Sequence, residues 1–334
     1  MRLEDFDFDL PQELIAKYPL PERHMARLMI LNRKDKTIKH DIFWNLPLYL
    51  NEGDLLVFND TKVLPARLYG KKPTGGKVEV LLTDYISQNL WHALVGGKNI
   101  KEGLSVSVAE DFHIKILKHI SEGKFLVELV AKNPIEALYM YGHIPIPPYL
   151  ERQEEEIDRI YYQTVFAKRE GSVAAPTASL HFSDQLLEKL ENYGIRRAFI
   201  TLHVSYGTFK PIKVNDIKAH KVDEEYMEVP QETVDLIKMV KEEGKRVIAV
   251  GTTVVRALET KPFSAFCGKT DLYIYPGYTF KVVDAMITNF HLPRSSLLLL
   301  VSAFAGREFT LEAYSVAVRE RYRFYSYGDG MLIL

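Results

Sequence analysis

The chain has almost no cysteine and no long apolar run. Cys267 is the only cysteine among 334 residues, so neither an intramolecular disulfide nor a cysteine-rich zinc cluster can form. The N-terminus, MRLEDFDFDLPQEL, is acidic where a signal peptide has a basic start and an apolar core. The longest later apolar run, residues 297–305, is far too short to span a bilayer. We therefore expect a cytoplasmic protein with no membrane contact.

An excess of either charge is also missing. The formal net charge is −1, so no overall positive field attracts nucleic acid. A contact with RNA would have to use a local cluster of basic side chains, and Arg319, Arg321 and Arg323 form one such cluster in the sequence. The same three residues could equally be the solvated face of a helix.

Common nucleotide-binding and metal-binding motifs are absent. Two of the Gly-Lys pairs, at residues 76–77 and 97–98, are followed by Val78 and Asn99 instead of the hydroxyl residue of a phosphate-binding loop. The best candidate for a dinucleotide-binding turn, residues 328–330, lies too near the C-terminus for a helix to follow. The zinc-binding motif H-E-x-x-H does not occur. One polar cluster contains a single histidine and no second one at metal spacing; it consists of His220, Asp223, Glu224 and Glu225. We interpret this cluster as an exposed acidic turn without a metal.

Residues 63–131 have the texture of an all-β module. Apolar and polar positions alternate there in short runs separated by Gly, Lys and Asp. The runs are residues 63–69, 78–82, 91–95, 105–108, 113–117 and 125–130. Such a set predicts a small antiparallel barrel or sandwich that closes its own edges. The proline-rich GHIPIPPYLER after it, residues 142–152, favours an extended connector.

After the connector the pattern changes to strand followed by helix. The expected strands are residues 198–204, 246–250 and 272–275, and the expected helices are residues 234–243 and 253–259. We predict an α/β main domain with an inserted small all-β, barrel-like domain. Residues 1–62 and 151–334 would form the main domain, and residues 63–150 the insert with its connector.

The uncharged stretch VAAPTASLHF, residues 173–182, is a candidate binding wall. Small side chains around Pro176, Thr177 and Ala178 allow the backbone to approach a ligand, and His181 follows them. The alternative is a buried turn in which Thr177 or Ser179 caps a helix that begins at Asp184.

Three further stretches place polar residues where strands end. In RVIAVGTTVVRALE the turn Gly251-Thr252-Thr253 leads into a helix that carries Arg256. The electropositive N-terminus of that helix could bind an anion, or Thr252 or Thr253 could be an ordinary N-cap.

The other two stretches contribute histidines. ITLHVSYGTFKP puts His203 in a strand before the turn Gly207-Thr208, where a buried core histidine is the alternative. MITNFHLPRSSL brings Asn289 and His291 to the end of a strand, before a helix opened by Ser295 or Ser296. Ligands of open α/β sheets bind at such strand ends, so His181, His203 and His291 are expected near one site.

These stretches resemble a known family. The matching motifs are NDTKVLPARL, TGGKVEVLL, GHIPIPPY, YQTVFA, VAAPTASLHF, TLHVSYGTF, VGTTVVRALE, TNFHLPRSSLLLLVSAFAG and YRFYSYGDGMLI. In this order they resemble the S-adenosylmethionine:tRNA ribosyltransferase-isomerases of queuosine biosynthesis, nearly from end to end. The chain departs from the family pattern at Ser179 in place of glycine, at Ser205-Tyr206 in place of Gly-Ala or Gly-Gly, and at Asp223 in place of a second histidine.

The resemblance implies the reaction. The ribosyl part of S-adenosylmethionine would move onto 7-aminomethyl-7-deazaguanine at the tRNA wobble position and rearrange to an epoxycyclopentane, while adenine and methionine leave. S-adenosylmethionine would be consumed as a substrate, with no separate cofactor and no metal, and we expect a monomer. The chemistry needs a base and an acid that titrate near neutral pH, which favours histidine.

We therefore predict His203, His181 and His291 as catalytic residues, with His203 nearest to the reacting ribose. The predicted substrate-binding residues are Pro176, Thr177, Ala178, Gly251, Thr252, Thr253, Arg256, Asn289 and Arg323. Arg23, Arg27, Arg152 and Arg323 are candidates for salt-sensitive tRNA contacts. Two other classes remain open: another S-adenosylmethionine-dependent RNA enzyme such as a methyltransferase, and a tRNA-binding module without catalysis, to which a small barrel would be suited.

Overall fold

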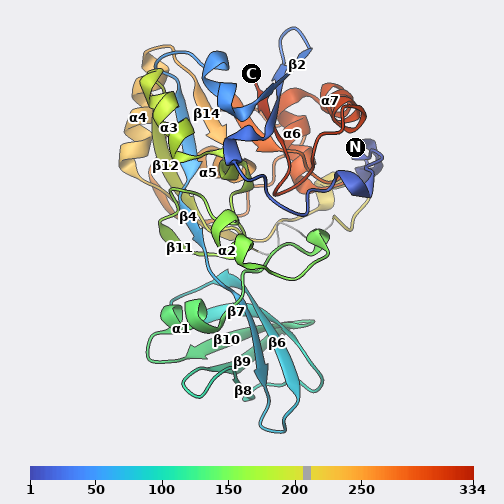
Figure 1. Cartoon of the computed structure of the whole chain (residues 1–334), viewed down its shortest axis with the longest axis vertical. Coiled ribbons are helices and arrows are strands. Elements are labelled where there is room, and N and C mark those ends of the chain that lie inside the picture. Colours follow the sequence, from blue (N-terminus) through green and yellow to red (C-terminus); the bar gives the residue numbers. More distant parts are fainter. Residues whose placement is uncertain (206–211) are drawn as a thin grey trace.

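The computed structural model describes residues 1–205 and 212–334, arranged as a large sheet domain and a smaller barrel (Figure 1). The departure at Tyr206 and the turn Gly207-Thr208 lie outside the described residues.

One mixed sheet organises the large domain. Its strands follow the order β15–β13–β12–β3–β14–β16–β17–β1–β2. The central four run parallel: β12 (Arg196–Leu202), β3 (Leu55–Asn59), β14 (Val247–Val250) and β16 (Ala285–Asn289). The flanking strands are β13 (Glu225–Val229), β15 (Phe266–Thr270), β17 (Gly330–Ile333), β1 (Arg27–Asn32) and β2 (Thr37–Ile42). Strands β3, β14 and β16 are buried throughout, as expected for parallel strands covered on both faces.

Helices cover both faces of this sheet. Alternate residues of β3 belong to two separate apolar clusters, with Leu55 and Val57 in one and Leu56 and Phe58 in the other. The first cluster takes in α4 (Gln231–Glu242), α5 (Thr252–Thr260), α6 (Ser296–Ala305) and α7 (Arg307–Arg319). The second takes in α3 (Asp184–Asn192) and the 3₁₀ segment Phe43–Tyr49. The predicted α/β main domain is confirmed.

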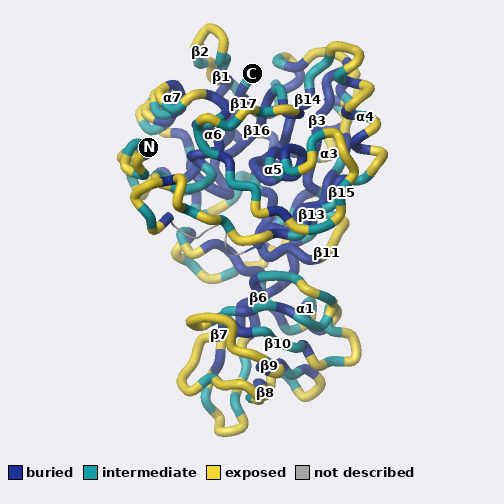
Figure 2. Tube along the Cα trace, turned by 180° about the vertical axis from the view of Figure 1, so that it is seen from behind, coloured by how far each residue is buried: buried dark blue, intermediate teal, exposed yellow. Residues whose placement is uncertain are grey.

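The smaller part is a closed barrel in the order β10–β7–β6–β5–β8–β9. Its strands are β5 (Arg67–Lys71), β6 (Lys77–Tyr85), β7 (Leu90–Gly96), β8 (Ser105–Ser107), β9 (His113–Ser121) and β10 (Lys124–Val130). Strands β7 and β10 alternate buried and partly exposed residues, with Trp91 fully buried inside. Figure 2 shows the buried interior and the exposed turns. Helix α1 (Pro134–Tyr141) packs Ala137 and Leu138 onto the same core. The predicted small all-β barrel is confirmed.

The two chain segments that join barrel and sheet domain lie side by side. Before the barrel, β4 (Thr61–Val63) pairs with β11 (Arg169–Ser172). Arg67 and His143 then exchange two backbone hydrogen bonds, of 3.0 and 2.8 Å. Helix α2 (Glu156–Tyr161) follows the connector. The division into residues 63–150 and the remainder stays a prediction. No helix of the described residues is long and apolar enough to cross a bilayer.

Some local expectations were wrong. Residues 272–275 form no strand, because β15 at Phe266–Thr270 takes the position beside β13. The run 63–69 is interrupted, since β4 pairs outside the barrel and β5 begins only at Arg67. Helix α3 is capped by Ser183, which accepts from the Leu186 amide, and not by Thr177 or Ser179. Ser295 caps α6 as expected.

Gly142 provides a test of the junction. A Cβ at this position would lie 2.0 Å from the Pro65 carbonyl oxygen, so Gly142→Ala must push the two connecting segments apart. We expect a loss of about 1–3 kcal/mol in the free energy of unfolding, measured with urea. Gly96→Ala is the matched control, because its Cβ would meet only ordinary contacts at 3.9 Å. Equal stability of the two variants would show that the junction is not closely packed.

Candidate functional site

A cavity of about 520 Å³ lies where the central parallel strands end. Three segments that line it come within two residues of the ends of β12, β14 and β16: Val204, Gly251–Thr253 and His291. The carboxyl edge of a parallel sheet is the usual place for ligands, and the volume lies within the range of about 300–1,000 Å³ typical of ligand pockets. Further lining residues come from the N-terminal segment, the connector and the C-terminal segment: Leu3, Tyr149, Tyr325 and Ser326.

One wall of the cavity is the predicted stretch of small residues. Pro176, Thr177 and Ala178 line it at the start of the 3₁₀ segment Thr177–His181. Opposite them, Gly251 has φ +102°, and a side chain there would approach the Ala178 Cβ at 3.7 Å. Glycine thus both permits the turn and keeps the cavity open. Neither Thr252 nor Thr253 caps α5, so the alternative of an ordinary threonine N-cap is wrong.

Asn289, at the end of β16, is held in one orientation. Its Nδ2 donates to the Tyr325 carbonyl oxygen at 3.0 Å, and a carbonyl can only accept. The same Nδ2 lies 3.2 Å from His181 Nε2. Asn289 Oδ1 is buried and has no partner among the described residues, although the residue lines the cavity. The site therefore holds an acceptor suited to an N–H group of a ligand.

His181 contacts the side-chain amide of Asn289. Its ring stacks on Phe43 at 4.2 Å between centroids, and the residue does not line the large cavity. Burial, and then the positive charges of Arg23 and Arg323, lower the pKa of His181 to about 3. The ring is therefore neutral at pH 7, so that Nε2 can accept from Asn289.

His291 lines the cavity itself. Its Nε2 lies 2.7 Å from Thr288 Oγ1, and its backbone amide donates to the Tyr314 hydroxyl at 2.9 Å. Burial lowers the pKa of His291 to about 3, which keeps this ring neutral as well.

His203 lies at the junction with the barrel instead. It directly follows β12, and its Nδ1 lies 2.8 Å from Thr61 Oγ1. The ring stacks on Tyr226 and meets Tyr85 of the barrel edge-on. A Cβ on Gly171 would come within 2.6 Å of Nε2, so glycine makes room for the ring. Burial, and then Arg169, lower the pKa of His203 to about 4. Its role nearest to the ribose stays a prediction, without support from the cavity lining.

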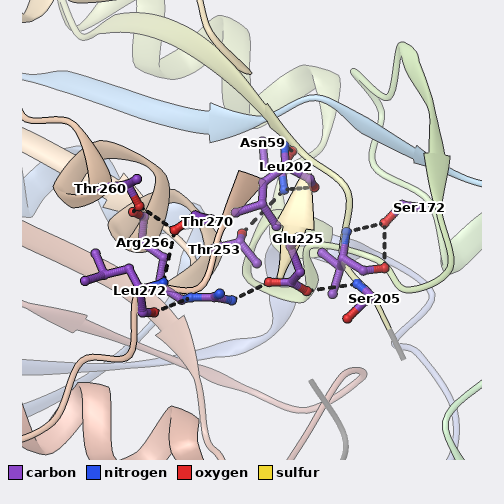
Figure 3. Close-up of polar contacts among 11 residues, drawn as sticks. Asn59, Ser172, Leu202, Ser205, Glu225, Thr253, Arg256, Thr260, Thr270 and Leu272 are labelled. Carbon is purple, nitrogen blue, oxygen red and sulfur yellow. Dashed lines mark hydrogen bonds and ion pairs between the residues drawn. The ribbon is translucent and has the colours of Figure 1, made fainter. Parts of the chain in front are cut away.

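Arg256 lies beside a second, smaller cavity of about 60 Å³. It donates from Nε to the Leu272 carbonyl at 3.0 Å and from Nη1 to the Glu225 carboxylate (Figure 3). Glu225 also accepts from the Ser205 amide at 2.9 Å. Glu225 is only 3% exposed, so its assignment to an exposed acidic turn was wrong, whereas Asp223 and Glu224 are exposed. No group of three metal-ligating side chains occurs within residues 1–205 and 212–334.

Most of the candidate arginines serve the fold. Arg152 makes a bidentate pair with the buried Asp158 at 2.7 Å, and Arg23 donates to three backbone carbonyls. Arg323 donates to the Tyr18 carbonyl and does not line the large cavity. Arg27 lies over the Tyr322 ring. Alanine substitutions here would therefore test folding before they test tRNA binding.

Some residues in this region were not predicted from the sequence. Asn59, at the end of β3, bonds to Leu202 and to the Thr61 amide, and Tyr149 and Tyr325 stack their rings beside the cavity. Asn59 opens the motif NDTKVLPARL, so its place at a strand end was the available signal.

Comparison with known proteins gives a consistent result. A family model described as queuosine biosynthesis protein matches residues 3–333. The S-adenosylmethionine:tRNA ribosyltransferase-isomerase of Aquifex aeolicus is 70% identical, and that of Thermotoga maritima 47% identical, each over 100% of both chains. The crystal structure of the S-adenosylmethionine tRNA ribosyltransferase from Thermotoga maritima has a TM-score of 0.58 and 39% identity, covering 99% of this chain and 100% of that one.

The buried neutral histidines predict a dependence of stability on pH. The unfolded chain binds a proton at His181 with a pKa near 6.5, whereas the folded protein binds it only near 3. Stability from the neutral ring is complete above pH 6.5 and is lost as the pH falls towards 3, because protons then favour the unfolded chain. As the pH falls from about 6 to 4, the free energy of unfolding of His181→Asn should decrease by about 1.4 kcal/mol per pH unit less than that of the unsubstituted protein. Urea unfolding at several pH values measures this, and parallel curves for both proteins would contradict it.

Proposed function

The chain belongs to the family of queuosine biosynthesis proteins, and from this membership we propose the reaction that it catalyses. It transfers the ribosyl moiety of S-adenosylmethionine onto 7-aminomethyl-7-deazaguanine at the tRNA wobble position and isomerises it to give epoxyqueuosine-tRNA. Adenine and methionine are released, so S-adenosylmethionine is a consumed substrate. The observation that carries the proposal is the full-length match to relatives that bear this enzyme's name, together with a cavity of suitable size at the strand ends.

The large cavity is the proposed site for the adenosyl group. Its apolar wall of Ala175, Pro176 and Ala178 offers a flat surface to a base or ribose. The unpartnered Asn289 Oδ1 would accept from an exocyclic N–H of adenine, a group that carries hydrogen-bond donors. His181 would be a positioning residue, because it reaches the ligand only through Asn289.

His291 is the proposed proton-transfer group within the cavity. The reaction removes a proton beside the sulfonium and delivers one to the departing adenine. A charged imidazolium next to the sulfonium would be repelled, and His291 is neutral at pH 7 because it is buried. Thr288 holds its Nε2, which leaves Nδ1 for the substrate. His203 remains the second proposed catalytic residue, at the junction with the barrel.

The reaction is tested with purified protein, S-adenosylmethionine and tRNA that carries 7-aminomethyl-7-deazaguanine. We expect release of adenine and methionine in equal amounts and a matching mass increase of the wobble nucleoside. The control is the same tRNA with unmodified guanine at that position. Release of S-adenosylhomocysteine would identify a methyltransferase, and binding of tRNA without turnover would identify a non-catalytic module.

Each of the two histidine assignments is tested by its own alanine substitution. Replacing a general acid or base typically slows turnover by about 10²–10⁴-fold. We expect His291→Ala to lower the rate of adenine release by at least about a hundredfold with little change in tRNA affinity. His203→Ala should do the same if it acts in proton transfer. Normal adenine release by a folded, thermally stable His203→Ala protein would show that His203 is not catalytic. The same result for His291→Ala would show that His291 is not catalytic.

A further inference from the structure

Three residues that line the smaller cavity each carry a buried hydrogen-bond donor without an acceptor among the described residues. Arg256 Nη2, Ser205 Oγ and the Tyr273 hydroxyl are all buried, and none has a partner among the described residues. All three residues line the cavity of about 60 Å³. Ser205 is only 5% exposed. A buried donor without an acceptor destabilises a structure, so three such donors around one cavity indicate a missing acceptor.

The smaller cavity adjoins the proposed adenosyl site. Leu297 lines both cavities, and Ser205 of the smaller one directly follows Val204 of the larger one. On α5, Arg256 comes one helical turn after Thr252, so the two side chains lie on the same face. The volume is well below the usual range of about 300–1,000 Å³ for a whole ligand. The smaller cavity therefore fits one end of a molecule whose body lies in the larger cavity.

The chemistry of the donors identifies that end. A carboxylate has two oxygens that only accept, and a guanidinium with hydroxyl groups is well suited to bind it. Glu225 already occupies Arg256 Nη1 (Figure 3), which leaves Nη2 for a ligand.

We infer that Arg256, Ser205 and Tyr273 bind the α-carboxylate of the methionyl part of S-adenosylmethionine, which places the sulfonium between the two cavities. This inference rests on the proposed function. It assigns the smaller cavity to the amino-acid end of the substrate, and thereby sets the direction in which the substrate lies along α5.

The test uses decarboxylated S-adenosylmethionine, which lacks only the carboxylate. For wild-type protein with the modified tRNA, we expect kcat/KM for adenine release to be about 10- to 100-fold lower with this analogue, as for the loss of hydrogen bonds to a charged group. The discrimination is the ratio of kcat/KM for S-adenosylmethionine to kcat/KM for the analogue. Arg256→Lys and Ser205→Ala should lower this ratio severalfold, because they weaken use of the natural substrate more than use of the analogue. A purely structural role would lower both rates equally.

Ser205→Ala should leave the fold intact, because it removes a hydroxyl that has no partner among the described residues. Ser302→Ala is the matched control: its Oγ is also buried and unpartnered, but it lines neither cavity. That control should discriminate as wild type does. Equal use of both substrates by wild type, or unchanged discrimination in both Arg256→Lys and Ser205→Ala, would overturn the inference.

The same comparison can be made without turnover. Equilibrium dialysis without tRNA measures the affinities for S-adenosylmethionine and for decarboxylated S-adenosylmethionine. Loss of discrimination in Arg256→Lys and Ser205→Ala would support the carboxylate site even if no adenine were released. Absence of adenine release with normal discrimination in binding would therefore refute the proposed reaction and leave the carboxylate site intact.

Discussion

The side-chain amide of Asn59 joins β3 to two of the segments that build the site, the end of β12 and the start of α5. At the end of β3, its Nδ2 donates to the Leu202 carbonyl at 2.9 Å, and its Oδ1 accepts from the Leu202 amide at 3.0 Å. It thus continues the pairing of β3 with β12 by side-chain bonds where the backbone ladder stops. Nδ2 also lies 3.5 Å from Thr253 Oγ1 on α5, which brings that helix to the same point (Figure 3). Because Asn59 is fully buried, each of these bonds must be kept for the fold to be stable.

The positions of His203, Ser205 and Arg256 follow from this junction of β3, β12 and α5. Beyond Leu202 the chain leaves the sheet, so His203 turns towards the barrel while Val204 and Ser205 reach the two cavities. Beyond Gly251, α5 presents Thr252 to the large cavity and Arg256 to the small one. Along α5, one helical turn thereby separates the proposed adenosyl site from the proposed amino-acid site. The barrel contacts this region through Tyr85, which meets His203 at the junction.

The sequence predicted the architecture well, because the patterns behind it are local. Alternation in Leu90–Gly96 and Lys124–Val130 reflects one face turned into a barrel, and the apolar Val247–Val250 reflects a strand covered on both faces. Asn59 was missed and Glu225 was wrongly assigned to an exposed turn, since their partners lie far away in the sequence and a polar residue near a turn is usually exposed. The strand expected at residues 272–275 failed for the same reason, because the choice of edge strand depends on pairing with β13. Three histidines were expected at one site, whereas the structure places only His291 in the lining of the large cavity.

The central claim is that ribosyl transfer takes place in the cavity at the carboxyl ends of β14 and β16. A crystal structure of the protein with S-adenosylmethionine tests it most directly. The account predicts density for the adenosyl group between Pro176–Ala178 and Thr252–Thr253, with an N–H group of adenine at Asn289 Oδ1. Density for the nucleoside at the barrel junction beside His203, with the cavity filled only by water, would contradict it.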